Sequence, residues 1–168
     1  MVATVYGDVN NWNVCICTHQ TGAAGSETPD TTQGTLIYLL AKEVNFPFKS
    51  ESKDKDVDGG NSYTTQTGKR NFSCNFNDII VFKATQATVT AEFNCVFNYF
   101  KTLTKLGASK VYCFYKCIAD NTYVSLSCNA ACTQNTNYMK GYPRDFPAKQ
   151  AEGNLFYFGS LRFKEVLL

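Results

Sequence analysis

Histidine is almost absent from this sequence, and the usual motifs of catalysis are absent too. His19 is the one histidine among 168 residues, so a Ser-His-Asp or Cys-His arrangement would have to use it. No residue pattern positions a nucleophile beside it, and there is no G-x-S-x-G, glycine-rich phosphate loop or histidine-rich metal motif. We therefore expect a protein that is not an enzyme and that carries no cofactor.

Long apolar runs and blocks of one charge sign are also lacking. No stretch is continuous enough for a membrane span, and the N-terminus MVATVYGDVNNWNV lacks the cationic start and apolar run of a secretory signal. The 16 Lys and Arg nearly balance the 14 Asp and Glu, and no basic block is longer than Lys69-Arg70, so the sequence shows no footprint for gripping nucleic acid. We expect one domain over residues 1–168, made in the cytoplasm, with no membrane partner.

Cysteine is plentiful, but its spacing does not indicate a metal site. There is no C-x-x-C, and a tetrahedral zinc site would need four cysteines from separate strands. Cys113 and Cys117 fall in an expected strand, where residues four apart are separated by roughly 13 Å and cannot bond to each other. Without a secretory signal a reducing compartment is expected, so we interpret the cysteines as small buried apolar residues, with cross-strand pairs still possible. The eight positions are 15, 17, 74, 95, 113, 117, 128 and 132.

Alternating apolar residues predict a mainly β chain. Strands are expected at 11–18, as a half-buried strand, at 35–48 and at 71–82, with a long exposed loop at 19–34. Pro47 places the end of the second strand at a sheet edge or bulge. A hairpin is expected over 110–133 with its turn at 119–121, then a turn-rich connection at 134–150 and a final strand at 151–168. This order predicts an antiparallel β-sandwich or barrel with one packed α-helix and a long extended hairpin loop.

One segment changes from strand to helical periodicity. Apolar residues recur three and four positions apart between residues 84 and 107, which predicts a helix at about 90–106 that ends before Gly107. An aromatic stripe with this spacing is typical of a helix face packed on a sheet. The residues expected to pack the helix are Phe93, Val96, Phe97, Phe100 and Leu103, and Leu106 continues the stripe.

The polar stretch 49–64 has neither helical nor strand-like apolar periodicity. Its D-x-D-x-D-G string at 54–59 is similar to a calcium loop, but the bidentate Glu expected six residues after the Gly is Thr65. We interpret the alternating charges as a solvated or interfacial run between two strands.

The stretch EVNFPFKSESKDKDVDGGNSYTTQTGKRNFSCNFNDII resembles the tail-tube (major tail) proteins of long-tailed bacteriophages. In that family a strand leads into a Ser/Thr/Asp/Lys-rich hairpin with a Gly pair, then a glycine-bearing turn, here Thr67-Gly68-Lys69-Arg70, and a strand of alternating residues. The helix, the hairpin and a final apolar-Gly-apolar strand, LFYFGSLRF, follow in the family's order. The resemblance covers about residues 35–164.

The resemblance implies a structural virion protein that forms hexameric rings, stacked into the tube through which DNA is ejected. The partners implied are further copies of the chain, other tail proteins, and DNA that passes through the lumen without specific binding. The long hairpin would contact the next ring, and strands of adjacent subunits would continue one another within a ring. The residues expected in the ring-to-ring contact are Ser50, Glu51, Ser52, Lys53, Asp54, Lys55, Asp56, Val57 and Asp58.

Two alternatives stay open. A β-sandwich binding module that recognises a receptor or carbohydrate would use aromatic stacking surfaces such as Trp12, Tyr112, Tyr115 and Tyr123. A tail terminator of similar fold would form a single ring.

Overall fold

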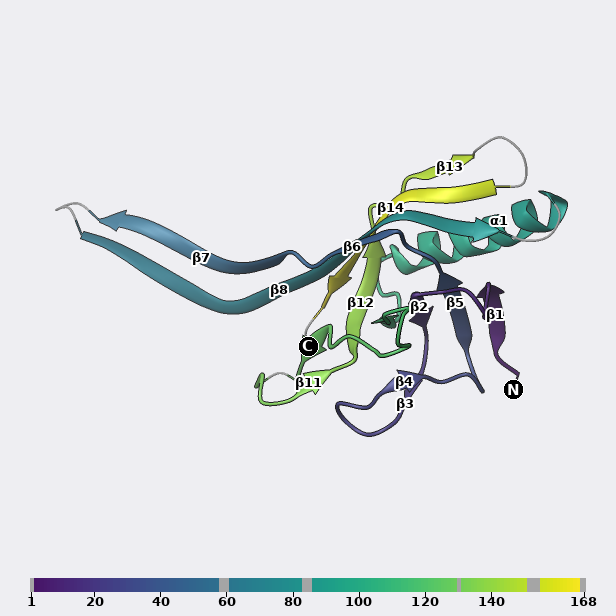
Figure 1. Cartoon of the computed structure of the whole chain (residues 1–168). Coiled ribbons are helices and arrows are strands. Elements are labelled where there is room, and N and C mark those ends of the chain that lie inside the picture. The colour runs from purple at the N-terminus through teal and green to yellow at the C-terminus, as the bar shows by residue number, and fades with distance from the viewer. Residues whose placement is uncertain (1, 58–60, 83–85, 130, 151–154, 167–168) are drawn as a thin grey trace.

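The chain folds around one large, strongly twisted β-sheet with a long helix packed against it, as the computed structural model shows (Figure 1). The structure describes residues 2–57, 61–82, 86–129, 131–150 and 155–166. The elements are β1 (Thr4–Gly7), β2 (Val14–Cys17), β3 (Gln20–Thr21), β4 (Thr28–Pro29), β5 (Thr35–Leu39), β6 (Glu43–Asn45), β7 (Phe48–Val57), β8 (Asn61–Phe82), α1 (Gln86–Leu103), β9 (Val111–Tyr115), β10 (Ser127–Cys128), β11 (Asn135–Thr136), β12 (Tyr138–Arg144), β13 (Ala148–Gln150) and β14 (Leu155–Glu165). The prediction of a mainly β chain is confirmed.

The main sheet is mixed, which corrects the expectation of a purely antiparallel one. Its order in the described part of the chain is β1-β5-β2-β9-β12-β14-β8-β6, with β13 paired to β14 and β7 paired to β8. β2 returns antiparallel to β5, and β1 joins the other edge of β5 in parallel, with Thr4 opposite Thr35. Strand β1 was not predicted, because a strand of four residues is too short to show a clear alternation of apolar and polar residues.

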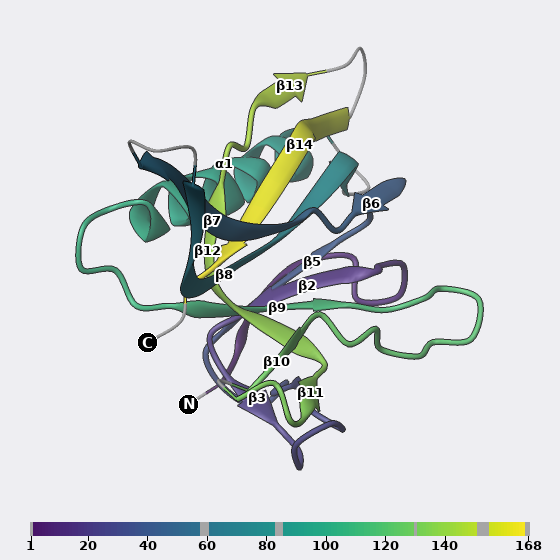
Figure 2. The ribbon, with the colours of Figure 1, turned by 90° about the vertical axis from the view of Figure 1, so that its left-hand side faces the viewer.

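The longest strand, β8, belongs both to the body and to an arm that leaves it. Its first half pairs with β7 from Val57↔Asn61 to Phe48↔Phe72, and its second half pairs with β14 and β6. Figure 1 shows β7 and the first half of β8 projecting from the body as a two-stranded arm, which points toward the viewer in Figure 2. The ten residues of β7 span about 30 Å. The stretch expected to be a polar loop is therefore mostly strand, and its polar residues hid the alternation on which strand prediction depends.

Helix α1 begins four residues before the predicted start and ends three residues before the predicted end. Short i to i−3 bonds from the Thr104 and Lys105 amides tighten the chain after Leu103, and Gly107 adopts a positive φ of 79°. Leu106 was expected on the packed face, but it lies beyond the helix and is fully exposed.

The inward face of α1 carries the aromatic stripe. Phe93, Val96, Phe100 and Leu103 are buried, and Phe97 packs half-buried against the same cluster. The rings of Phe93 and Phe100 lie 5.3 and 5.6 Å from that of Phe158 on β14. These ring contacts join the helix to the sheet.

A second, smaller cluster covers the other face of β2, β5 and β9. It consists of Cys15, Cys17, Leu36, Tyr38 and Phe114, with Trp12 and Tyr123 packed against it. All four residues of β2 are consequently buried, so the expectation of a half-buried strand at 11–18 was wrong.

Two predictions for the C-terminal half were also wrong. The 134–150 segment was expected to be a connection, but it contains β12, which lies between β9 and β14 in the sheet. The expected 110–133 hairpin is reduced to one isolated bridge, Lys116↔Tyr123, because β9 pairs with β2 and β12 instead. Gly141 and Pro143 gave β12 the appearance of a turn, although its residues alternate between buried and half-buried.

Candidate assembly surfaces

The arm is continuous with the hydrophobic core. In β8 the arm ends at Phe72, and Cys74 and Phe76, two and four residues further on, are fully buried in the main cluster. Phe76 lies opposite Leu161 on β14, and Cys74 lies opposite Phe163. Because β8 continues from the arm into the body, the arm is anchored directly in the packed sheet.

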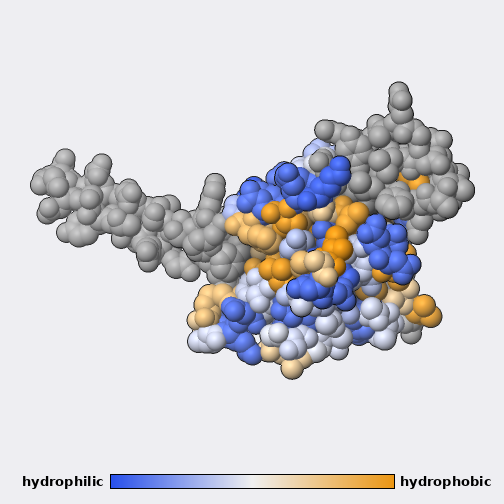
Figure 3. Space-filling view, viewed as in Figure 1, coloured by the Kyte–Doolittle hydropathy of each residue, from blue (hydrophilic) through white to orange (hydrophobic). Residues whose placement is uncertain are grey.

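An apolar pocket of about 230 Å³ lies at the root of the arm. It is lined by Phe46, Pro47, Ser73, Val124, Ser125, Leu126 and Met139. Phe46 remains 46% exposed although its ring lies 5.9 Å from that of Tyr115. Figure 3 shows hydrophobic surface on the body near the place where the arm leaves it. Exposed apolar surface of this kind is typical of a protein contact site.

Strand β1 forms the opposite end of the sheet. The Thr4 amide donates to the Gly34 carbonyl on the β5 side, so the backbone groups of Val5 point away from β5. The Gly7 amide, which also points away, donates to Glu92 Oε1 at 2.5 Å. Val5 is 44% exposed, and Val2 just before the strand is almost fully exposed. This edge therefore offers both open backbone groups and apolar side chains to another strand.

The residues expected in the ring-to-ring contact fall on β7. The structure places Ser50 to Val57 along this strand of the arm, with a register shift between Ser50 and Ser52. Asp58 and the side chains of Ser50–Val57 lie outside the described residues. The assignment of this contact therefore stays a prediction.

The aromatic residues of the alternative binding module do not form one surface. Trp12 lies 4.9 Å from the Tyr38 ring and 6.4 Å from the Tyr123 ring, and Lys116 Nζ caps it at 3.8 Å. Tyr115 instead packs against Phe76 in the other cluster. Trp12, Tyr112 and Tyr123 are half-buried against the smaller cluster and Tyr115 against the main one, so the four rings are divided between the two faces of the sheet.

The cysteines separate into three kinds. Cys15, Cys17, Cys74 and Cys113 are buried free thiols, as the sequence suggested. Cys95 is exposed, and Cys117 is half-buried. Cys128 and Cys132 form a disulfide, whereas the cysteines were expected to be small buried apolar residues with cross-strand pairs still possible.

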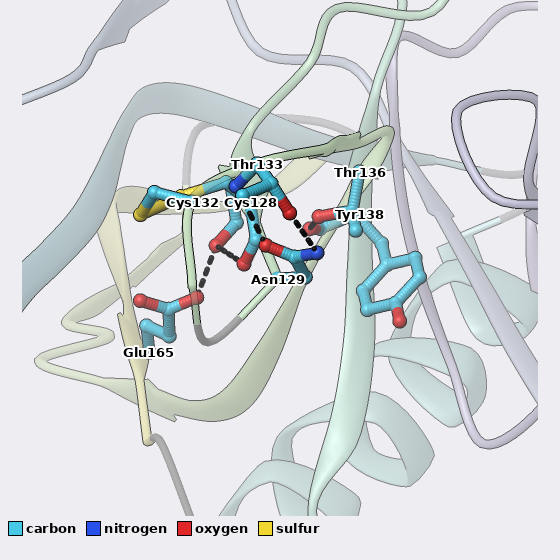
Figure 4. Close-up of a disulfide and its surroundings, with 8 residues drawn as sticks. Cys128, Asn129, Cys132, Thr133, Thr136, Tyr138 and Glu165 are labelled. Carbon is cyan, nitrogen blue, oxygen red and sulfur yellow. Dashed lines mark hydrogen bonds between the residues drawn. A yellow bond between two sulfur atoms is a disulfide. The ribbon is translucent and has the colours of Figure 1, made fainter.

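The disulfide closes the turn between β10 and β11 (Figure 4). The turn is also held by the Thr133 amide, which donates to Asn129 Oδ1 at 2.9 Å, and Ser127 on β10 donates to Glu165 of β14. This pair was not predicted, because a reducing compartment was expected and residues 122–133 were assigned to a strand of the hairpin, in which two residues four apart lie too far from each other for a disulfide. That argument holds for a strand, whereas a turn brings the two Cα atoms to 5.0 Å.

Burial raises the pKa values of several core groups. Desolvation raises the pKa of the Cys74 thiol to about 12, with a smaller contribution from the Glu165 carboxylate. Desolvation likewise raises the pKa of Tyr38 and of Tyr123 to about 12. These shifts favour the neutral forms and give no activated nucleophile.

The His, Cys, Asp and Glu side chains are dispersed over the described ranges. There, no group of three or more His, Cys, Asp or Glu side chains is arranged to hold a metal ion. Within the same ranges, no helix combines the length and apolar character needed to cross a bilayer.

Comparison with known proteins adds no relative. No family model, no curated protein and no solved structure matches this chain.

Proposed function

We propose that this protein is a structural subunit that assembles with copies of itself into stacked hexameric rings, as a tail-tube protein of a bacteriophage virion does. The observation that carries the proposal is the β7–β8 arm, which pairs with itself and projects away from the body. A two-stranded hairpin without a packed face is marginally stable in water. Packing against the surface of another molecule would therefore stabilise the arm.

The two ends of the sheet support ring formation. β1 lies at one end and β6 at the other, and each is a terminal strand of the sheet order in the described chain. Pairing of β1 in one copy with the β6 end of the next copy is a heterologous contact, and such contacts close into rings when the rotation permits. The arm then supplies the contact between rings.

The arm contact is tested by shortening the arm in register. Removal of residues 53–56 and 62–65 deletes four residues from each strand and preserves the alternation of faces. We expect the full chain to form rings of about 112 kDa, six copies of 18.7 kDa, which stack into tubes in negative-stain electron microscopy. The shortened chain should form rings that do not stack.

The control is a chain with Lys42→Gln and Lys101→Gln, which loses two exposed charges outside the arm, keeps the arm intact and should form tubes. Tubes from the shortened chain would show that the arm does not join rings. A full chain that stays monomeric at millimolar concentration, with an unchanged circular dichroism spectrum, would overturn the proposal of assembly.

A further inference from the structure

Five basic residues gather on one face of the β9–β12–β14 part of the sheet. We call Lys110, Lys140, Arg144, Arg162 and Lys164 the basic face. On β12 the even-numbered residues are half-buried and the odd-numbered ones buried, and on β14 residues 160, 162 and 164 are the accessible ones. The alternation therefore places these cations on the side of the sheet away from Phe163 and Leu161.

Strand register brings the cations close together. Lys164 lies directly opposite Tyr142, and Arg144 lies opposite Arg162. One residue beyond the paired part of β9, the same register places Lys110 opposite Tyr142 from the other side. The Tyr142 hydroxyl donates to the Ala108 carbonyl at 2.8 Å, which holds the segment before β9 against this face.

The positive charge of the basic face is poorly neutralised. Like charges directly opposite on neighbouring strands, such as Arg144 and Arg162, are destabilising. Of the described acidic side chains, Asp145 is the one placed against them, at 3.9 Å from Arg162 Nη1, and it is 75% exposed. Glu165 points to the other side of the sheet, where it accepts the hydrogen bond from Ser127. An ion pair this exposed neutralises little of the positive charge of the basic face.

A polar hollow of about 260 Å³ adjoins these cations. It is lined by Asn75, Asn77, Asp145, Ser160, Leu161 and Arg162. Two buried atoms at this site, Arg162 Nε and Asn75 Oδ1, have no hydrogen-bond partner. Because an unsatisfied buried polar group is destabilising, the site is suited to a ligand that offers both an acceptor and a donor.

We propose that the basic face binds the phosphodiester backbone of a nucleic acid. Phosphate oxygens accept from guanidinium and ammonium groups, and a nucleotide also carries donors for the Asn75 oxygen. The arm of a second copy fits less well, since residues 48–72 carry five basic and four acidic side chains and so have no negative surplus. This face was not predicted, because its cations come from three separate segments of the chain and form no continuous basic block.

The test measures binding of fluorescent 20-nucleotide DNA, single-stranded and double-stranded, to the full chain by anisotropy at 50 and 200 mM NaCl. For single strands, four phosphate contacts predict about 50-fold weaker binding at the higher salt. The variant Arg144→Gln/Lys164→Gln should lose two contacts and show a salt effect of only about 7-fold. Comparison of the single-stranded and double-stranded DNA shows which of the two forms the basic face binds more tightly.

The matched control is Lys42→Gln/Lys101→Gln, which removes two exposed cations outside the basic face and has the same net charge. It should bind like the unaltered chain. Equal losses in both variants, or absence of binding at 50 mM salt, would overturn the proposal. Competition by poly-glutamate as strong as that by DNA would also overturn it, in favour of an acidic protein partner. The proposal does not depend on ring assembly, because the chain with the shortened arm should bind DNA unchanged.

Discussion

At the scale of single residues, burial decides how the cysteines respond to pH. Cys74 lies in the core beside β14, and desolvation raises the pKa of its thiol from 9.0 to about 12. Cys15 and Cys113, both fully buried, have pKa values raised by the same cause. The folded chain therefore keeps protons that the unfolded chain releases near pH 9.

This difference predicts that the free energy of unfolding falls as the pH rises from 8.5 to 10.5. In that range the unfolded state binds fewer protons than the folded state, so each such thiol contributes a slope of up to about −1.4 kcal/mol per pH unit. Cys74→Ala should make the decline shallower, as measured by urea unfolding at each pH. Val111→Ala, at a buried position without a titratable side chain, should lower stability but leave the slope unchanged, and an equal effect of both substitutions on the slope would contradict the assignment.

At the scale of elements, helix α1 could be predicted from the sequence, whereas strand β12 could not. The stripe of α1 was visible because Phe93, Val96 and Phe100 repeat at helical spacing on a face that one sheet covers. Strand β12 was not visible, because Gly141 has the appearance of a turn residue. β12 is a strand because it pairs with β14, and the sequence around β12 does not show that these two distant segments lie side by side.

The same holds for the assembly surfaces. The charged stretch of the arm stands out in the sequence, whereas the β1 edge and the basic face are created by pairing between distant strands. Arg144 and Arg162, for example, are neighbours through register alone. Such surfaces follow from topology and cannot be obtained from local pattern.

Close packing of β12 on β14 gives a prediction for Gly141. A Cβ atom at this position would lie 1.9 Å from the Lys164 carbonyl oxygen, so the two strands would have to separate. We expect Gly141→Ala to reduce the free energy of unfolding by about 3 kcal/mol, as overpacking against backbone does.

The matched variant is Gly107→Ala, where no atom lies within 4 Å but φ is positive. It should cost about 1 kcal/mol from backbone strain alone. Thermal and urea unfolding of the two variants compare the effects, and similar losses would show that the strand contact is looser than described.

At the scale of the whole molecule, the two ends of the sheet should act together in assembly. Val5→Lys places a charge on the β1 edge, a device that discourages strand addition. We expect this variant to remain monomeric by light scattering, with no rings in electron micrographs. Val9→Lys, at a position with 53% exposure outside β1, is the control and should form rings. Ring formation by Val5→Lys would remove β1 from the interface.

The basic face limits how subunits could be oriented in such a tube. Cations bind phosphates in a salt-dependent way and would retain passing DNA. If rings form, Arg144 and Lys164 should therefore face away from the lumen.

Strand β14 is the last element in chain order, yet it pairs with β8, β12 and β13. During synthesis β8 and β12 must both wait, with one edge open, until residues 155–165 have left the ribosome. Phe158 of β14 also supplies a ring that packs against Phe93 and Phe100 of α1, so these contacts form only after β14 has been made. Biogenesis of this fold thus ends in a single late step, and chains interrupted before it would expose bare strand edges to one another and aggregate.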